Sequence, residues 1–310
     1  MYKFAFFVLL CLFCDFARAD IPDLTTALQN TYHACVGIET DLTDMKRMAG
    51  INTVITGVGT GLGVGAIATG FAKKSIDKKI EDLDKLLSEI EKNSFDTLSP
   101  EERREFNQKF NSSYADAVKN KDSDKPSIED LNRKSKKLGY WRTGLLAGNT
   151  ATNIAGALIA NKNKINNDLQ SKIDRCIDKV KELNTSISAA RVAGEDTNEA
   201  QQIYQACREY EFIDLSPVNN RAKGAVISSA IGIVTGGIGT ATSAMANSDS
   251  IRNNNEDKGK EKEKNLNTAS NALAIGTTVA SAGATIFNAS QIAAIKKVVA
   301  VSEKCSEVLK

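Results

Sequence analysis

Residues 48–72 read MAGINTVITGVGTGLGVGAIATGFA, a glycine-rich stretch without a charged residue. Three more stretches lack charge, 143–161, 224–248 and 265–295, whereas the segments between them are densely charged. Their lengths suit a membrane-spanning helix, which needs about 20 mostly apolar residues. The basic residues at their edges include Lys73, Lys74, Arg142 and Lys162, placed as membrane-interface anchors would be. The four stretches are therefore uncharged arms, which either span a membrane or bury one another.

The charged segments have the periodicity of helices. Alternating spacings of four and three residues separate Ile76, Ile80, Leu83, Leu87 and Ile90, as in a helix that packs on a partner helix. Strand-like alternation is nearly absent outside the glycine-rich stretches. The predicted fold class is therefore all-α. A second apolar helical face consists of Ile165, Leu169, Ile173, Cys176, Val180 and Leu183.

Two parts of the chain resemble each other. The sequence YHAC at 32–35 resembles YQAC at 204–207, and VITG at 54–57 resembles IVTG at 233–236. We therefore predict an internal duplication, with two tandem antiparallel helical hairpins whose arms are rich in glycine and alanine. The four arms are either membrane-spanning or mutually buried. The first hairpin spans 20–190 with a charged connector at 73–142, and the second spans 191–310 with a charged connector at 249–264.

The first residues resemble a secretory signal. A basic start at Lys3, an apolar run at 4–14 and the small residues Ala17 and Ala19 form its three parts. We therefore predict that residues 1–19 are a signal peptide that is removed when the protein is exported. The alternative is an uncleaved membrane anchor.

Removal of this segment leaves the four cysteines Cys35, Cys176, Cys207 and Cys305. An even number of cysteines in an exported chain indicates disulfides, and four cysteines allow three connectivities. Facing residues of two antiparallel helices have a constant sum of positions. The sum of 35 and 176 is 211, which places 51–72 opposite 139–160, and the sum of 207 and 305 is 512, which places 224–246 opposite the fourth uncharged stretch. We therefore predict the disulfides Cys35–Cys176 and Cys207–Cys305.

Small residues recur at every fourth position of the uncharged stretches. Positions four apart share one face of a helix, and small side chains there let two backbones approach closely. We predict that these glycines form packing faces, through which the chain oligomerises with itself or binds a protein partner. The candidate packing residues are Gly57, Gly61 and Gly65 in the first stretch, Gly144, Gly148 and Gly156 in the second, Gly232 and Gly236 in the third, and Gly276 in the fourth.

Composition argues against several kinds of site. Basic and acidic residues are nearly balanced, at 40 and 38, whereas a nucleic-acid-binding protein presents an excess of basic residues. His33 is the only histidine and lies near one cysteine, Cys35, which leaves too few ligands for a metal site. We therefore expect no nucleic-acid partner, no metal and no cofactor.

One motif invites an enzymatic interpretation. The turn TGVGTGLG at 56–63 follows INTVI at 51–55 and resembles the cofactor turn of short-chain dehydrogenases, in which glycines admit a pyrophosphate to a helix N-terminus. However, the sequence has no Tyr-x-x-x-Lys pair and no alternating strand and helix pattern, and one histidine leaves little for acid–base catalysis. We expect no catalytic residues and no small-molecule substrate.

These observations favour a non-enzymatic structural or assembly protein of the cell envelope, acting as a pore or a scaffold. We expect it in a membrane, with its cysteine-bearing segments on the exported side. One alternative is a soluble periplasmic or secreted helical bundle that binds a partner through its charged hairpin tips. Another is a secreted effector or toxin that inserts into membranes.

Overall fold

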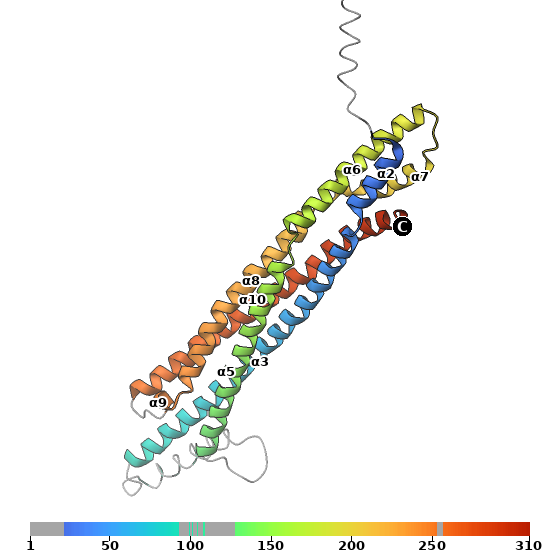
Figure 1. Cartoon of the computed structure of the whole chain (residues 1–310). Coiled ribbons are helices and arrows are strands. Elements are labelled where there is room, and N and C mark those ends of the chain that lie inside the picture. Colours follow the sequence, from blue (N-terminus) through green and yellow to red (C-terminus); the bar gives the residue numbers. More distant parts are fainter. Residues whose placement is uncertain are drawn as a thin grey trace, which may run out of the picture. The chain divides into compact units, whose positions relative to one another are not determined.

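The computed structural model describes residues 22–92, 128–252 and 257–310, together with the single positions 99, 101, 104 and 108. Across these residues the chain is helical and contains no strand, so the predicted all-α class is confirmed. The predicted signal peptide and the side chains of Leu87 and Ile90 lie outside the described part of the chain. The helices in chain order are α2 (Leu24–Cys35), α3 (Ile38–Lys92), α5 (Ile128–Lys162), α6 (Asn167–Val192), α7 (Asn198–Cys207), the 3-10 helix η1 (Arg208–Phe212), α8 (Ser216–Ala246), α9 (Asp249–Arg252) and α10 (Asp257–Val308) (Figure 1).

Local signals account for where several helices begin. Asp23 precedes α2, and its carboxylate accepts a hydrogen bond of 2.8 Å from the Thr26 N–H, which lowers the pKa of Asp23. Asn166 caps α6 in the same way, since its side chain accepts a bond of 2.8 Å from the Leu169 N–H. Gly37 lies between α2 and α3 with a φ of 87°, which residues with a side chain rarely adopt. This glycine therefore permits the turn between the two helices.

The chain folds into two compact units, each assembled from separate segments. The first, which we call the cysteine unit, consists of Met1–Asn52, Ile159–Gly224 and Phe287–Lys310. The second, which we call the glycine unit, consists of Thr53–Leu158 and Ala225–Ile286. Both units draw on each of the two predicted halves, because α3, α5, α8 and α10 are long helices that contribute residues to both. The compact units therefore differ from the tandem halves, and the duplication itself stays a prediction.

The cysteine unit has an apolar core. α6 buries the predicted face that includes Ile173, Cys176 and Leu183, and α2, α7 and parts of α3, α8 and α10 contribute further residues to the same cluster. The described charged residues of this unit are all at least partly exposed, and Lys172 pairs with Asp41 on the surface at 2.7 Å. Apolar side chains inside and charged ones outside are the arrangement of a water-soluble helical domain.

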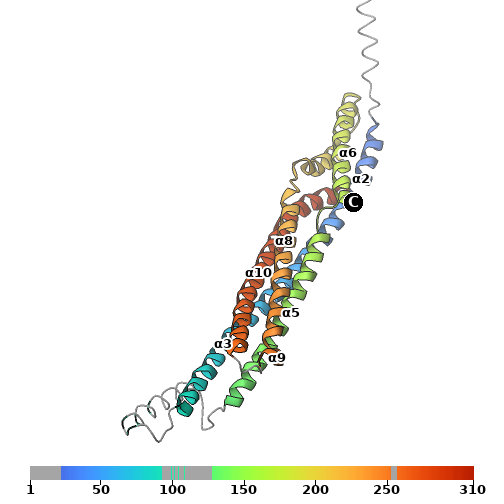
Figure 2. The ribbon, with the colours of Figure 1, turned by 90° about the vertical axis from the view of Figure 1, so that its left-hand side faces the viewer.

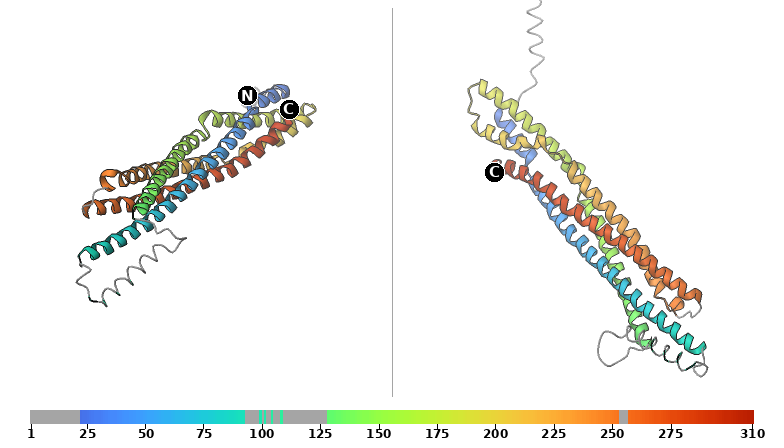
Figure 3. Two further views of the ribbon diagram at one scale, coloured as in Figure 1. Left: turned by 90° about the horizontal axis from the view of Figure 1, so that it is seen from below. Right: turned by 180° about the vertical axis from the view of Figure 1, so that it is seen from behind.

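In the glycine unit, segments of four long helices lie along one another. Figure 2 shows α5, α8 and α10 side by side, and the view from behind in Figure 3 shows α3 beside α10. Buried positions recur at alternating spacings of three and four residues, the seam of helices that coil around one another. Most of these side chains are small or polar. They are Thr56, Gly59, Gly63, Ala66, Gly70 and Lys73 in α3; Gly139, Arg142, Leu146, Asn149, Asn153 and Gly156 in α5; Ala225, Ser229, Gly232, Gly236, Gly239, Ser243 and Ala246 in α8; and Ser270, Ala274, Thr277, Ser281 and Ala284 in α10.

Candidate functional site

Two buried disulfides lie in the cysteine unit. Cys35 at the end of α2 is bonded to Cys176 of α6, with 4.8 Å between their Cα atoms. Cys207 at the end of α7 is bonded to Cys305 of α10, with 4.5 Å between their Cα atoms. This is the pairing predicted from the register of the uncharged stretches. The bonds join residues 141 and 98 positions apart in the chain.

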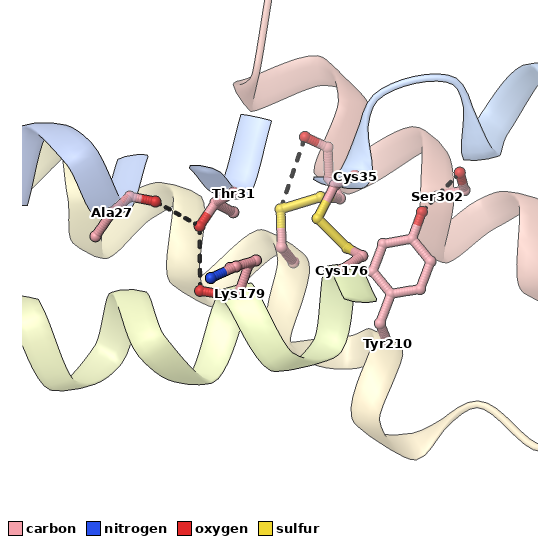
Figure 4. Close-up of a disulfide and its surroundings, with 9 residues drawn as sticks. Ala27, Thr31, Cys35, Cys176, Lys179, Tyr210 and Ser302 are labelled. Carbon is pink, nitrogen blue, oxygen red and sulfur yellow. Dashed lines mark hydrogen bonds between the residues drawn. A yellow bond between two sulfur atoms is a disulfide. The ribbon is translucent and has the colours of Figure 1, made fainter. Parts of the chain in front are cut away.

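Buried hydrogen bonds accompany the disulfides (Figure 4). The Thr31 hydroxyl of α2 lies 3.2 Å from the Lys179 carbonyl oxygen of α6 and 2.9 Å from the Ala27 carbonyl oxygen of its own helix. The Tyr210 hydroxyl of η1 donates to Ser302 Oγ of α10 at 2.8 Å, and burial raises the pKa of Tyr210. These bonds reinforce the contacts of α2 with α6 and of η1 with α10.

In the glycine unit, α3 contacts α5 in the register of the first disulfide. A side chain added at Gly59 would overlap Thr152, and a Cβ at Gly65 would stand 3.3 Å from Leu145 Cδ1. Positions 59 and 152 add up to 211, and positions 65 and 145 add up to 210. The nearly constant sum shows that these segments run antiparallel.

The contacts of α8 with α10 follow the register of the second disulfide. A Cβ at Gly239 would stand 3.2 Å from Leu273 Cβ, and a Cβ at Gly283 would stand 3.2 Å from Ser228 Oγ. Positions 239 and 273 add up to 512, and positions 228 and 283 add up to 511. The sum of positions is therefore again nearly constant along these two segments.

The predicted packing glycines fall into two groups. Six of them lie at or near contacts between helices. A side chain at Gly232 or Gly236 would overlap α5, Gly148 and Gly65 face leucines at 3.1 and 3.3 Å, Gly276 faces Thr235 at 3.6 Å, and Gly156 is buried in the seam of α5. The other three are Gly57, Gly61 and Gly144, where a Cβ would meet no atom within 4 Å. The structure gives these three glycines no contact inside the chain, and their role in packing against a partner stays a prediction.

The periodicity of the seam explains this division. On α3 the glycines at which a Cβ would overlap a neighbouring side chain are Gly59, Gly63 and Gly70. Because glycine occupies every second position from 57 to 65, the sequence offers more than one glycine stripe. A uniform spacing of four residues selects Gly57 and Gly61, whereas the actual seam alternates three and four and passes on the other side of them.

The middle of the glycine unit holds a buried network of polar side chains. Ser281 Oγ of α10 donates to Asn149 Oδ1 of α5 at 2.8 Å, and Asn153 Nδ2 of α5 donates to Ser281 Oγ at 2.8 Å. Glycines on the facing helices make room for the amides, because a Cβ at Gly63 would stand 2.7 Å from Asn149 Nδ2 and one at Gly232 would stand 2.6 Å from Asn153 Oδ1. We refer to Asn149, Asn153 and Ser281 as the amide layer.

A second polar layer lies further towards the start of α5. Arg142 is 1% exposed, and its Nη2 lies 3.4 Å from the Asn267 carbonyl oxygen of α10. Thr143 Oγ1 lies 2.8 Å from Ser243 Oγ of α8 and accepts a bond of 3.2 Å from Asn247 Nδ2. We refer to these five residues as the arginine layer. The sequence interpretation treated Arg142 as an interface anchor, whereas the structure buries it.

An apolar layer separates the two polar layers. Ala66 of α3, Leu146 of α5 and Ala274 of α10 are each 0% exposed and form one cluster, with Ile67 and Leu145 packed against it. Leu146 follows Arg142 by four residues and precedes Asn149 by three, so the layers succeed one another along a single face of α5. The interior is therefore polar, then apolar, then polar.

Several buried polar atoms of the glycine unit have no hydrogen-bond partner among the described residues. Such atoms are uncommon in folded proteins, and each calls for a physical reason. They are Arg142 Nε, Asn149 Nδ2, Asn153 Oδ1, Ser229 Oγ, Asn247 Oδ1 and Asn271 Oδ1. All six side chains come from the seam or its immediate edge.

The outer surface of the uncharged stretches in the glycine unit is apolar. Large apolar side chains point outwards from all four helices, and on α8 they extend from Ile227 to Met245, a distance of roughly 27 Å at 1.5 Å per residue. Val234 is 60% exposed and Leu158 is 62% exposed. The outward-facing side chains are Val54, Val58, Val64 and Phe71 in α3; Tyr140, Trp141, Ile154 and Leu158 in α5; Ile227, Ile231, Val234, Ile238 and Met245 in α8; and Ile275, Val279 and Ile286 in α10.

Three helical segments of the described chain are long and apolar enough to cross a membrane. They are Leu24–Lys85, Ser216–Ala246 and Lys258–Val308. The segment that contains α5 is not among them. Its uncharged stretch carries Asn149 and Asn153, and both asparagines face the interior of the glycine unit.

One buried ion cluster lies at the end of the uncharged stretches. Lys73 of α3 is 1% exposed, and its Nζ lies 2.7 Å from Asp77 Oδ2 and 3.0 Å from Glu263 Oε1 of α10. Ser135 of α5 donates to the other oxygen of Asp77. In the sequence Lys73 is placed as an interface anchor would be, and in the structure it joins three helices.

The described residues contain no group of three or more His, Cys, Asp and Glu side chains that could hold a metal ion. Comparison with protein-family models, with curated proteins and with solved structures finds no match to the chain.

Proposed function

We propose that this chain is a non-enzymatic membrane protein of a cell envelope. The uncharged stretches of its glycine unit lie in the lipid bilayer, and its cysteine unit lies in water on the exported side. The observation that carries the proposal is the inverted polarity of the glycine unit, which buries amides and hydroxyls between its helices and points Val, Ile and Leu side chains outwards.

Such polarity is unfavourable in water and suits a bilayer. Each aliphatic side chain that stays in water fails to gain the roughly 1.5–3 kcal/mol of stabilisation that its burial would provide. Buried polar groups in turn lose their hydration. In hydrocarbon, outward-facing residues such as Val234 and Leu158 match the solvent, and small seam residues with Asn and Ser side chains stabilise close helix packing. The apolar band of roughly 27 Å on α8 is close to the hydrocarbon thickness of about 30 Å.

Aromatic side chains support this location. Phe71, Tyr140 and Trp141 are 56%, 55% and 61% exposed, and they lie at the end of the apolar band beside Lys73 and Arg142. Trp and Tyr are enriched where a membrane meets water, because their rings are apolar and their N–H or O–H groups remain hydrated. This end of the glycine unit is therefore proposed to lie at a membrane–water interface.

The cysteine unit has the opposite polarity. Its aliphatic residues are inside, its charged residues are at least partly exposed, and it contains both disulfides. Disulfides persist in oxidising compartments, which supports a location of this unit on the exported side. The long helices then cross the bilayer as two antiparallel hairpins. The charged segments that follow Lys73 in α3, precede Tyr140 in α5 and begin α10 lie on the opposite side.

We further propose that the chain assembles with copies of itself and acts as a scaffold. Gly57, Gly61 and Gly144 leave parts of α3 and α5 without bulky side chains, and their Cβ positions are open within the chain. In a membrane such a surface lets a helix of another copy approach closely.

The alternatives make different predictions for location. A soluble bundle that binds a partner through its charged connectors has no need of the exposed aliphatic surface of the glycine unit. A secreted effector would carry the same surface but would first appear outside the membrane and would lyse added liposomes.

Membrane fractionation of the exported protein tests the proposal. We expect the mature chain in the membrane pellet after washes with high salt and alkaline carbonate, and in solution only after detergent. Recovery in the soluble fraction without detergent would refute the bilayer location. Lysis of liposomes by that soluble fraction would then favour the effector.

A further inference from the structure

We propose that the interior of the glycine unit is a gated path for small inorganic anions such as chloride. This inference rests on the bilayer location proposed above. The polar side chains of the seam are the path, Leu146 is its gate, and Arg142 selects for negative charge.

Several buried polar atoms of the glycine unit lack a partner among the described residues. Arg142 Nε and Asn149 Nδ2 are donors that no described residue accepts from, and Asn153 Oδ1, Asn247 Oδ1 and Asn271 Oδ1 are acceptors without a donor. Buried amides in a bilayer-embedded bundle are costly when unsatisfied. They become favourable when water or an ion can reach them, because N–H donors can replace part of the hydration shell of an anion.

Charge inside the glycine unit is unevenly compensated. Among its described residues, two basic side chains are buried, Lys73 and Arg142. Lys73 is neutralised by Asp77 and Glu263, whereas no described carboxylate lies within ion-pair distance of Arg142. A buried guanidinium without a counter-ion attracts an anion and repels cations. The uncharged stretches contribute no acidic residue to the seam, so the interior favours negative charge.

The apolar layer interrupts the polar interior of the glycine unit. Leu146, Ala66 and Ala274 separate the arginine layer from the amide layer, and each is 0% exposed. A short apolar constriction between polar segments excludes water and so blocks ions until it opens. Leu146 is the bulkiest of the three, and one helical turn separates it from Arg142. The gate therefore lies directly beside the residue that selects the ion.

Flux through reconstituted vesicles tests the path. The full mature chain is incorporated into phospholipid vesicles that contain either a chloride-quenched dye or a potassium-sensitive dye. We expect slow chloride flux with the unchanged protein. Leu146→Asn places a polar side chain in the apolar layer and is expected to raise chloride flux at least about tenfold. Leu146→Ala, which shortens the side chain but keeps it apolar, is expected to raise the flux less.

Two further variants separate the gate from general leakage. Leu158→Asn changes an outward-facing residue of the same helix and is expected to leave chloride flux unchanged. Arg142→Gln in the Leu146→Asn background is expected to reduce the preference for chloride over potassium by at least about tenfold, because the buried positive charge is removed. Intact disulfides on a non-reducing gel and a helical far-ultraviolet spectrum identify the variants that have folded.

Flotation of the vesicles distinguishes this inference from the proposed function. Protein that fails to float with the vesicles would overturn both. Protein that floats, with neither Leu146 variant passing chloride faster than Leu158→Asn, would overturn the anion path alone. Equal chloride and potassium flux in Leu146→Asn would overturn the role assigned to Arg142.

Discussion

Asn153 of α5 lies against Gly232 of α8, with Oδ1 and Cγ each 2.6 Å from the position that a Cβ on this glycine would take. The same asparagine donates to Ser281 Oγ of α10 at 2.8 Å. Gly232 therefore gives Asn153 the room in which it reaches α10. The asparagine cannot move away from α8 without weakening its bond to α10, so the two contacts depend on each other.

Gly232→Ala should consequently destabilise the glycine unit. The added methyl group forces Asn153 out of the amide layer, and overpacking of this kind costs about 1–3 kcal/mol. Thermal unfolding in detergent would measure the loss. Gly237→Ala is the matched control on the same helix, because a Cβ there meets nothing within 4 Å. Since alanine favours helix over glycine by about 1 kcal/mol, this control should be neutral or slightly stabilising. Equal loss in both variants would contradict the interdependence of the contacts.

Gly61→Leu tests assembly between copies. A side chain at this position meets no atom of the same chain within 4 Å, so the variant should unfold at nearly the same temperature as the unchanged protein. If a second copy packs on this surface, the leucine separates the helices, and assemblies that survive in mild detergent should fall apart. Val64→Leu, which enlarges an exposed residue of the same helix, should leave assembly intact. Identical assembly of both variants would remove the support for oligomerisation through Gly61.

Much of the fold can be predicted from the periodicity and the register of the sequence. The helical class, the apolar face of α6 and the pairing of the cysteines follow from spacings alone, because burial on a helix imposes a period and antiparallel packing imposes a constant sum of positions. The glycine contacts are different. Neither helix propensity nor composition tells whether Gly61 or Gly63 contacts another helix. Only the structure does so, because Thr278 and Asn149 occupy the space beside Gly63.

The polar interior was the feature that sequence reasoning missed. In the sequence, Asn149 and Asn153 lower the mean hydropathy of the second uncharged stretch, and Arg142 and Lys73 resemble flanking anchors. Their positions at seam spacing, with Leu146 between Arg142 and Asn149, were the available signal. Averaged hydropathy cannot detect it, because an inward-facing asparagine and a lipid-facing one contribute the same value to the mean.

Loss of either disulfide should weaken the cysteine unit. Cys35→Ser should leave Cys176 as a free thiol that reacts with a maleimide once the core opens, while Cys207 and Cys305 remain protected. On the chain-entropy model, closing loops of 141 or 98 positions contributes at most about 4–5 kcal/mol. Peptide mapping without reductant and chemical unfolding would measure pairing and stability. A Cys176–Cys207 peptide from the unchanged protein would contradict the fold.

Tyr210 should make the cysteine unit sensitive to alkali. Burial raises the pKa of Tyr210 above its ordinary value of 10.0, so the folded state holds this proton more tightly than the unfolded state. The resulting stabilisation is complete below pH 10 and is lost as the pH rises from there through the folded pKa. Tyr210→Phe removes the hydrogen bond to Ser302, at a cost of about 1 kcal/mol at neutral pH. The melting temperature of the Tyr210→Phe variant should fall less steeply between pH 9 and pH 11 than that of the unchanged protein. Parallel curves of melting temperature against pH would contradict the role of Tyr210 in this alkali sensitivity.

Lys73 should hold the end of the glycine unit together. Its ammonium group is buried between Asp77 of its own helix and Glu263 of α10, and these carboxylates remain 35% and 21% exposed. Lys73→Met would leave two carboxylates facing an apolar side chain. Removing one partner of a fully buried pair costs about 3–5 kcal/mol, and the partial exposure of the carboxylates reduces the expected loss to about 1–3 kcal/mol.

A second substitution separates charge from packing at this position. Glu263→Gln added to Lys73→Met removes one of the uncompensated carboxylates, so the double variant should recover part of the lost melting temperature. Lys74→Met is the matched control, because Lys74 is the exposed neighbour in the same turn of α3 and should be tolerated. Thermal unfolding of the three variants in one detergent would decide the matter. If Lys73→Met unfolds like Lys74→Met, the buried ion cluster does not join α3 to α10, and the end of the bundle is held by its seam alone.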